Sequence, residues 1–431
     1  MCTQRVIAFE RIYTKFIASL YERSSKEGKN MIKRTKSIIA LSVICATPTL
    51  YAQEAGRIQA GQFDLIPSFS SSMAYVDNVA YARDNDPKIY SWRATLSPEL
   101  IAATEVDGNP VQIGYRLERG VFFSSSADDY TDHFAEASGQ FEFNSRHRVN
   151  AIAQFEDGHE ERGTGFSLGL GTAITTPDRY ISTAFGGEYM YGAVTSDGMI
   201  TLKANRETLD YDRTEQAYLI RDRVKNRVGA ELGYRIGSAT TAVLDVTQTY
   251  VRYDNQTGIE TRDSDETRVL LGLRWESTAA TTGFAKVGYK EKDFEAATRS
   301  TFYGTDWEVG VEWQPLSYST FKLSTNADTR ETNGEGNFIR GRDYSASWNH
   351  EWLDRLSSSV SISRETNEYI LDDEGIDNRD DELMRYSASL NYQARRYLSF
   401  SLFYQLADRD SNRESIGYDR NLVGISAEVT L

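Results

Sequence analysis

The sequence has few residues of the kinds that build disulfide frameworks, metal centres or nucleic-acid-binding faces. Its 431 residues include two cysteines and four histidines. Cys2 and Cys45 both lie ahead of a predicted signal-peptide cleavage point, so the mature chain is expected to have no disulfide and no thiolate chemistry. The formal net charge of −15 argues against the basic face that phosphate contacts need, and nucleic acid is therefore not an expected partner.

Proline is also scarce, and long apolar runs are nearly absent. Seven prolines occur, and one apolar run approaches membrane length, close to the N-terminus. A helical membrane protein needs runs of about 20 apolar residues, so this class is excluded for the rest of the chain. Tyrosine (26), phenylalanine (19) and tryptophan (6) are plentiful instead. Many aromatic residues and few prolines favour a chain of many long strands.

Residues that catalysis or metal binding would use lack the required spacing. The four histidines are His133, His147, His159 and His350. Glu160 follows His159, but no second histidine completes H-E-x-x-H. The segment "FSSSADDYTDH" (123–133) gathers Ser, Asp and His, which leaves a surface hydrolase on a barrel scaffold open as an alternative. We otherwise expect a protein that is not an enzyme, with no catalytic, metal or cofactor-binding residues.

The N-terminal region predicts export through the inner membrane. Residues 31–52 have a basic start, an apolar run of about ten residues and a small final residue, typical of a signal peptide cleaved after Ala52. Residues 1–30 are interpreted as an extension or as a start codon placed too early. We expect residues 53–62 to form a short periplasmic lead and residues 63–431 to form the folded domain.

The mature chain repeats a strict alternation of apolar and polar residues. In "TDWEVGVEWQ" (305–314) one parity holds Trp307, Val309, Val311 and Trp313, and the other holds Asp306, Glu308, Gly310, Glu312 and Gln314. Because successive side chains of a strand point to opposite faces, such segments predict strands with two unlike faces. No helical period of 3.6 is found after the signal peptide. One such strand would suit either a soluble sheet or a membrane barrel.

The connections between strands decide between these two folds. Short turns such as 107–110 alternate with long polar segments such as 210–226, over about seventeen connections, and an outer-membrane barrel has short periplasmic turns and long external loops. We therefore predict an all-β fold, a transmembrane antiparallel up-and-down β-barrel of about eighteen strands. Sixteen strands stay open because 159–178 can be a loop, a bulged strand end or part of another hairpin.

The alternation assigns residues to two faces of this barrel. Ten residues at about 3.3 Å each, tilted by roughly 40°, cross about 25 Å of bilayer, so aromatic residues near strand ends are expected to form girdles. The predicted girdle residues are Tyr234, Trp275, Tyr303, Trp313 and Tyr404. The predicted lumen-lining residues are Arg116, Arg227, Glu231, Arg235, Arg268, Arg274, Lys286, Glu308 and Glu312, with Lys290, Glu99 and Glu136. Their mixed signs argue against a pore dedicated to one ion.

The last strand resembles the C-terminal signal that bacterial barrel-assembly machinery recognises. Its apolar face consists of Val423, Ile425, Ala427, Val429 and Leu431, with leucine where phenylalanine is usual. The resemblance implies that the assembly machinery and outer-membrane lipid are partners of the chain.

Three further motifs resemble a family of β-barrel porins often encoded with exopolysaccharide and capsule synthesis genes. They are a Y-x-DN element (Tyr75, Asp77, Asn78), the "RHR" turn (146–148) and "HEERGTG" (159–165). The resemblance implies an outer-membrane conduit that exports an extracellular or capsular polysaccharide, with a periplasmic polysaccharide-export protein as its partner. A general diffusion porin remains an alternative.

Overall fold

The computed structural model describes residues 57–83, 85–212, 218, 220–254, 260–278, 280–332, 334–371 and 377–430. These residues belong to one compact unit, Glu54–Leu431. The predicted signal peptide, the extension ahead of it and Leu431 lie outside the described residues. The described part of the chain contains no helix that is both long enough and apolar enough to cross a membrane.

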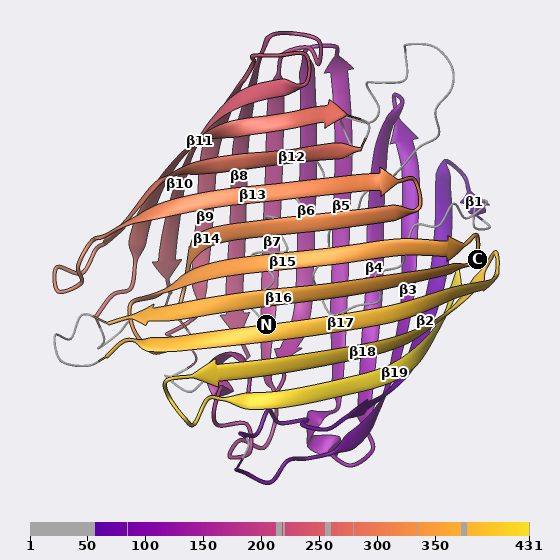
Figure 1. The fold of residues 1–431 in the computed structure, drawn as a ribbon, viewed down its shortest axis with the longest axis vertical. Helices are drawn as coiled ribbons and strands as arrows, with labels where there is room; N and C mark the ends of the chain where they lie inside the picture. Colours follow the sequence, from indigo (N-terminus) through magenta and orange to yellow (C-terminus); the bar gives the residue numbers. More distant parts are fainter. Residues whose placement is uncertain are drawn as a thin grey trace. The chain divides into compact units, whose positions relative to one another are not determined.

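Eighteen long strands within the described residues form one antiparallel sheet that closes on itself (Figure 1). They are β2 (Phe63–Val76), β3 (Ser91–Val106), β4 (Asn109–Phe122), β5 (Tyr130–Asn144), β6 (His147–Glu160), β7 (Asp178–Tyr191), β8 (Gly198–Tyr211), β9 (Arg223–Arg235), β10 (Thr240–Tyr253), β11 (Ser264–Thr278), β12 (Thr281–Phe294), β13 (Phe302–Leu316), β14 (Ser319–Arg330), β15 (Phe338–Leu353), β16 (Leu356–Ile370), β17 (Arg379–Arg395), β18 (Leu398–Ser411) and β19 (Tyr418–Thr430). Each strand pairs with the next, and β19 pairs with β2 to close the wall. The predicted barrel of eighteen strands is confirmed, and the alternative of sixteen is wrong.

Within the described residues, three complete short elements accompany the barrel: one strand and two turns of 3₁₀ helix. β1 (Ile58–Ala60) folds back on the start of β2 through a turn at Gly61, whose φ of +66° suits glycine. Two single turns of 3₁₀ helix lie in loops, η2 (Ser126–Asp128) and η3 (Gly165–Ser167). Because β6 ends at Glu160 and β7 begins at Asp178, the ambiguous segment 159–178 is mostly a loop that contains η3.

The wall has an apolar outer face and a polar inner face. Large apolar side chains of alternate residues are exposed, such as Leu271, Val287 and Ile425, each at least 62% exposed. Neighbours of opposite parity, such as Asp306 and Lys292, are only 1% exposed. In a closed single-layer wall, buried residues face the lumen and exposed ones face outward. The alternation seen in the sequence therefore separates a lipid-facing surface from a charged lumen.

The two ends of the barrel carry connections of different length. At one end the strands join through tight turns such as 107–108 and 354–355. The other end carries longer connections such as 77–90 and 161–177. This asymmetry matches the sequence prediction, and it identifies the end with long loops as the external mouth.

One seam of the wall separates before it reaches the external mouth. Pairing between β13 and β14 ends at Glu308 and Asn326, although β13 continues to Phe302 and β14 to Arg330. Extending this register by two residues would set Asp306 directly opposite Asp328, and like charges in that position are destabilising. The sequence therefore disfavours closing the seam at this point.

Beyond the point where β13 and β14 separate, the external end of the β14–β15 hairpin lies on the lumen side of β11, β12 and β13. Thr329 contacts Glu266 on β11 and lies 3.4 Å from the ammonium of Lys290 on β12. The ring of Phe338 lies 4.8 Å from that of Phe302 on β13. The two edges of the wall therefore overlap at the external end, joined by polar contacts and an aromatic pair.

Candidate functional site: the barrel lumen

A network of ion pairs lines the lumen on consecutive strands. Lys203 on β8 lies 3.0 Å from both Glu231 on β9 and Asp245 on β10. Lys286 on β12 lies 3.3 Å from Asp245 and 2.7 Å from Glu308 on β13. Each of these ammonium groups bridges two carboxylates, which ties neighbouring strands together across the sheet.

Three more cations extend this network, which we call the charged wall. Arg268 contacts Glu308 at 2.5 Å, Arg274 contacts Glu231, and Lys290 contacts Glu266 at 3.3 Å and Asp306 at 2.8 Å. The charged wall thus sets five cations against five carboxylates on β8–β13. Because every charge has a close partner of opposite sign, this surface concentrates neither cations nor anions.

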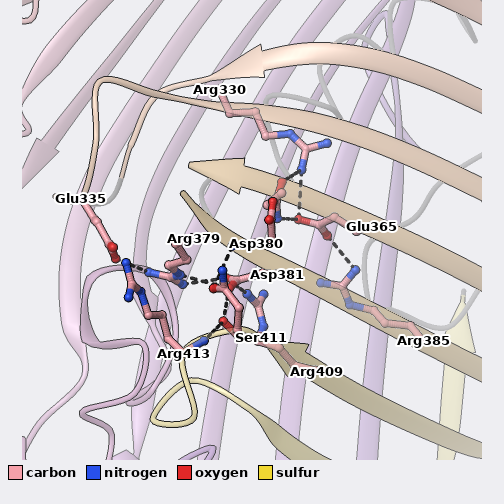
Figure 2. Close-up of polar contacts among 12 residues, drawn as sticks. Arg330, Glu335, Glu365, Arg379, Asp380, Asp381, Arg385, Arg409, Ser411 and Arg413 are labelled. Atoms are coloured by element: carbon pink, nitrogen blue, oxygen red, sulfur yellow. Dashed lines mark hydrogen bonds and ion pairs between the residues drawn. The ribbon is translucent and has the colours of Figure 1, made fainter. Parts of the chain in front are cut away.

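A second cluster lies on the lumen side of β14–β17, nearer the external mouth (Figure 2). The guanidinium of Arg330 contacts Asp343 at 2.5 Å, Glu365 at 3.0 Å and Asp328 at 3.1 Å. Arg385 reaches the other oxygen of Glu365 at 3.0 Å. The Arg330 side chain is only 4% exposed, so this guanidinium depends on its three carboxylates for solvation.

Asp381 is the centre of the neighbouring cluster in Figure 2. It accepts hydrogen bonds from Arg379 at 2.6 Å, Arg409 at 2.9 Å and Ser411 at 2.6 Å. Arg379 also contacts Glu335 in the loop before β15, at 3.0 Å. Sequence analysis did not single out these residues, because alternation shows which side chains face inward but not which of them meet.

The structure brings six of the predicted lumen residues into the charged wall: Glu231, Arg268, Arg274, Lys286, Lys290 and Glu308. The other predicted lumen residues lie apart from the charged wall, and most have their own partners.

Two of these residues form separate ion pairs: Arg116 with Glu118 at 2.7 Å, and Glu312 with Lys322 at 3.2 Å. Three form hydrogen bonds: Arg235 donates to the Val194 carbonyl at 2.6 Å, Glu99 accepts from Ser68 at 3.2 Å, and Glu136 accepts from Gln154 at 2.9 Å. Arg227 is half-buried on β9.

The residues predicted to form girdles have outward-facing parity. Tyr234, Tyr303, Trp313 and Tyr404 are exposed, and Trp275 is half-buried. Tyr303 and Trp313 lie near opposite ends of β13, whereas Tyr404 lies at the middle of β18. Their role as girdle residues stays a prediction. The Tyr404 hydroxyl donates to Asn421 on β19 at 2.6 Å.

Residues of the predicted assembly signal lie on the last strand. Val423 and Ile425 are exposed on the outer face of β19, and Ala427 and Val429 share their parity and are half-buried. Leu431, which would complete the signal, lies outside the described residues. Recognition by assembly machinery stays a prediction.

The Y-x-DN element closes the barrel at its external end. Asp77 accepts hydrogen bonds from the backbone and side-chain nitrogens of Asn421, both at 2.7 Å. Asn78 is fully buried and donates to the carbonyls of Ala82 at 2.7 Å and Asp419 at 2.9 Å. This motif therefore fastens the first long strand and its loop to the last strand, a structural role that sequence analysis did not assign.

The "HEERGTG" segment begins a loop, 161–177, that lies across the external mouth. Gly163 has a φ of +81°, and a side chain there would collide with the Ala80 carbonyl, which is 2.2 Å from the position of a Cβ. Gly171 meets the same carbonyl at 2.0 Å. The Phe166 ring lies 3.2 Å below the guanidinium of Arg221, in the loop between β8 and β9. The backbone of loop 161–177 is therefore packed tightly against the backbone of the loop between β2 and β3 at the mouth.

Glu161 anchors this loop through a buried ionic contact, which we call the mouth latch. Its carboxylate accepts a hydrogen bond from Tyr81 and lies 3.5 Å from Arg420 and 3.6 Å from Arg93. Burial alone would raise the pKa of Glu161, but the two guanidinium groups and the Tyr81 hydroxyl together lower that pKa to about 2. Burial also raises the pKa of Tyr81 well above its usual value, so its hydroxyl remains a donor.

The segment that suggested a hydrolase makes other contacts. His133 pairs with the Tyr115 hydroxyl at 2.7 Å, while the Ser125 hydroxyl donates to Asp128. Asp132 contacts His159 at 2.9 Å. A nucleophilic serine would need a hydrogen bond to its base, and the contacts of His133 and Ser125 are directed elsewhere.

A closed antiparallel barrel with an apolar exterior, a charged lumen, and short turns opposite long loops defines an outer-membrane β-barrel channel. The family described as "Putative beta-barrel porin 2" matches residues 52–431, and the chain belongs to this family. Family membership indicates a channel rather than an enzyme. The genomic association with polysaccharide synthesis stays an implication of the sequence resemblance.

Similar solved structures include three proteins of Pseudomonas aeruginosa. The outer membrane protein OpdK has 12% sequence identity, covers 85% of this chain and 99% of its own, and gives a TM-score of 0.46. OpdL has 11% identity, 86% and 99% coverage and a TM-score of 0.46. The siderophore receptor PirA has 8% identity, 85% and 80% coverage and a TM-score of 0.43. No protein of curated function matches the chain.

Proposed function

We propose that this porin is an outer-membrane conduit through which an extracellular or capsular polysaccharide leaves the cell. The observation that carries the proposal is the local neutralisation of the lumen. Each cation of the charged wall lies within 3.3 Å of a carboxylate, so an uncharged hydrated chain meets no strong field of either sign. Such cargo would move by weak and repeated contacts.

The external mouth supports a conduit that opens for its cargo rather than a permanently wide pore. Loop 161–177 is held across the mouth by the mouth latch and by tight packing at Gly163 and Gly171. Export of a polymer would require this loop to move aside. A periplasmic polysaccharide-export protein is the proposed partner, and the end with short turns is where it would approach.

A general diffusion porin is the second candidate. It is favoured by the same paired charges, because a wall that selects neither sign also suits passage of small hydrophilic solutes. The two candidates predict different losses when the protein is absent. A polysaccharide conduit is needed for polymer to reach the cell surface, whereas a diffusion porin is needed for uptake of small solutes.

Deletion of the gene in the source organism tests the proposal. We expect the deletion strain to lose its surface polysaccharide and to accumulate the polymer in the periplasm, and complementation with the wild-type gene to restore export. Normal export by the deletion strain would contradict the proposal. Large unselective conductance of the purified protein in planar bilayers, together with normal export, would favour the diffusion porin.

A further inference from the structure

A patch of serine side chains faces the lumen on two adjacent strands. It consists of Ser357, Ser359, Ser361 and Ser363 on β16 and Ser387 and Ser389 on β17, and we call it the hydroxyl wall. The intervening residues Val360 and Ile362 are exposed on the outer face, which places the serines of opposite parity inside. The lumen parity is the same as that of Glu365, farther along β16.

Strand register arranges these serines as a grid. Ser361 lies opposite Ser387, and Ser359 lies opposite Ser389. On the other side of β16, Ser347 of β15 lies opposite Ser361. Hydroxyls of this grid repeat roughly every 6.6 Å along a strand and about every 4.8 Å between strands, because of ordinary strand geometry. The grid therefore offers many equivalent polar positions.

The hydroxyl wall retains hydrogen-bonding capacity that the protein does not use. The Ser357 side chain is only 4% exposed, and its hydroxyl has no hydrogen-bond partner among the described residues. The same holds for the hydroxyl of Ser363. Buried polar atoms normally have partners, so these two hydroxyls mark unused polar capacity in the serine row of β16. Ser359 and Ser361, which lie between them in this row, are half-buried and face the lumen.

The chemistry of the wall selects the class of ligand. A serine hydroxyl both donates and accepts, as do the hydroxyls of a sugar, and it carries no charge that would attract an ion. β17 and β8 are nine strands apart in the closed order of eighteen, so the hydroxyl wall faces the start of the charged wall across the lumen. Because the charges on that side are paired with one another, the charged wall attracts a chain of neither sign, and the hydroxyl wall is the side that offers uncharged hydrogen-bonding partners.

We propose that the hydroxyl wall is the binding track for an uncharged polysaccharide, an inference that rests on the proposed function and specifies its substrate class. The chain forms many hydrogen bonds that are individually weak in net terms. Exchange between equivalent positions on the grid lets it slide without a deep binding minimum, as conduction requires.

Ligand-observed NMR on the full barrel in detergent tests the track. The probes are maltoheptaose, a neutral gluco-oligosaccharide, and an oligogalacturonate of equal length. In the quadruple variant S359A/S361A/S387A/S389A we expect the affinity for maltoheptaose to fall about tenfold, because several weak hydrogen bonds are lost together. The matched variant S359T/S361T/S387T/S389T retains the hydroxyls and is expected to bind within about threefold of wild type.

The outcomes separate this inference from the proposed function. Unchanged maltoheptaose binding in the alanine variant would overturn the track, as would tighter binding of oligogalacturonate than of maltoheptaose to the wild type. The proposed function would survive either result if the deletion strain still failed to export. Normal export by the deletion strain removes the proposed function itself. Three results together would support the track. The wild type binds maltoheptaose weakly, the alanine variant loses this binding while the threonine variant keeps it, and the alanine variant exports polysaccharide more slowly.

Discussion

The charged wall and the hydroxyl wall share the same strand geometry but differ in the chemistry of their side chains. In the charged wall, Lys286 lies directly opposite Glu308, and long side chains reach further partners on either side. In the hydroxyl wall, Ser361 lies opposite Ser387, and such short side chains contact few neighbours. Charged pairs use up their hydrogen-bonding capacity within the protein, whereas the hydroxyls of Ser357 and Ser363 have no partner among the described residues. Ion pairs therefore hold one side of the lumen together, and the proposed track lies on the other side.

The boundary of the charged wall at the β13–β14 seam gives the largest expected contrast. With Cys2 and Cys45 replaced, cysteines at Val309 and Thr325, which lie opposite each other, should cross-link almost completely with a short thiol reagent. Cysteines at Thr305 and Thr329, four residues farther along the same register, should not cross-link, because the strands have separated there. Gel mobility after proteolysis between β13 and β14 measures the cross-linking yield of each pair. Equal yields would mean that the seam is closed.

Removal of a buried cation should cost more than any change in the hydroxyl wall. Arg330→Met leaves Asp328, Asp343 and Glu365 without their shared guanidinium, and loss of one partner from a buried ion pair costs about 3–5 kcal/mol. Urea unfolding of the refolded barrel measures the change. The control is the exposed ion-pair variant Arg364→Met, which is expected to have a much smaller effect because water screens this pair. Equal effects of the two variants would refute the importance of burial.

The mouth latch should give the barrel a specific sensitivity to acid. Since folding lowers the pKa of Glu161 from its usual 4.5 to about 2, the latch contributes its full stability above pH 4.5 and loses it as the pH falls toward 2. Glu161→Gln should lower stability by about 1–3 kcal/mol at pH 7, because Arg93 and Arg420 lose their carboxylate. The free energies of unfolding of the wild type and of Glu161→Gln, measured at several pH values, should converge near pH 2. A difference that stays constant with pH would contradict a stabilising role of ionised Glu161.

Single changes in the hydroxyl wall should be the smallest in effect. Ser361→Ala is expected to change the free energy of unfolding by less than about 0.5 kcal/mol, because this serine faces the lumen and is half-exposed. The same urea titration measures it beside Arg330→Met. A loss of unfolding free energy comparable to that of Arg330→Met would show that the serines stabilise the barrel. It would contradict the view that only the charged side chains do so.

Most of the architecture could be predicted from local pattern. Alternation along each strand is repeated eighteen times, and connection length alternates with it, so the barrel and its two ends follow without knowledge of any contact. Residues such as Arg268 and Lys286 could be assigned to the inner parity for the same reason. The serine alternation of β16, "SSSVSIS", is equally visible in the sequence. It was not singled out because serine is also common in exposed strands and turns.

Contacts between distant segments could not be read in this way. The partners of Glu161 come from residues 81, 93 and 420, and each is brought to the mouth only when the sheet closes. The roles of Asp77 and Asn78 likewise depend on β19, which lies more than 340 residues away. Local periodicity carries no information about such pairs.

The sequence by itself determined that the chain forms a two-faced sheet with an apolar exterior, because side-chain direction in a strand depends only on parity. Only the tertiary structure decided which charges neutralise one another, where the β13–β14 seam separates and what covers the mouth. These features depend on how strands far apart in the chain are placed when the wall curves shut, and on the competition between like and unlike charges across the resulting lumen.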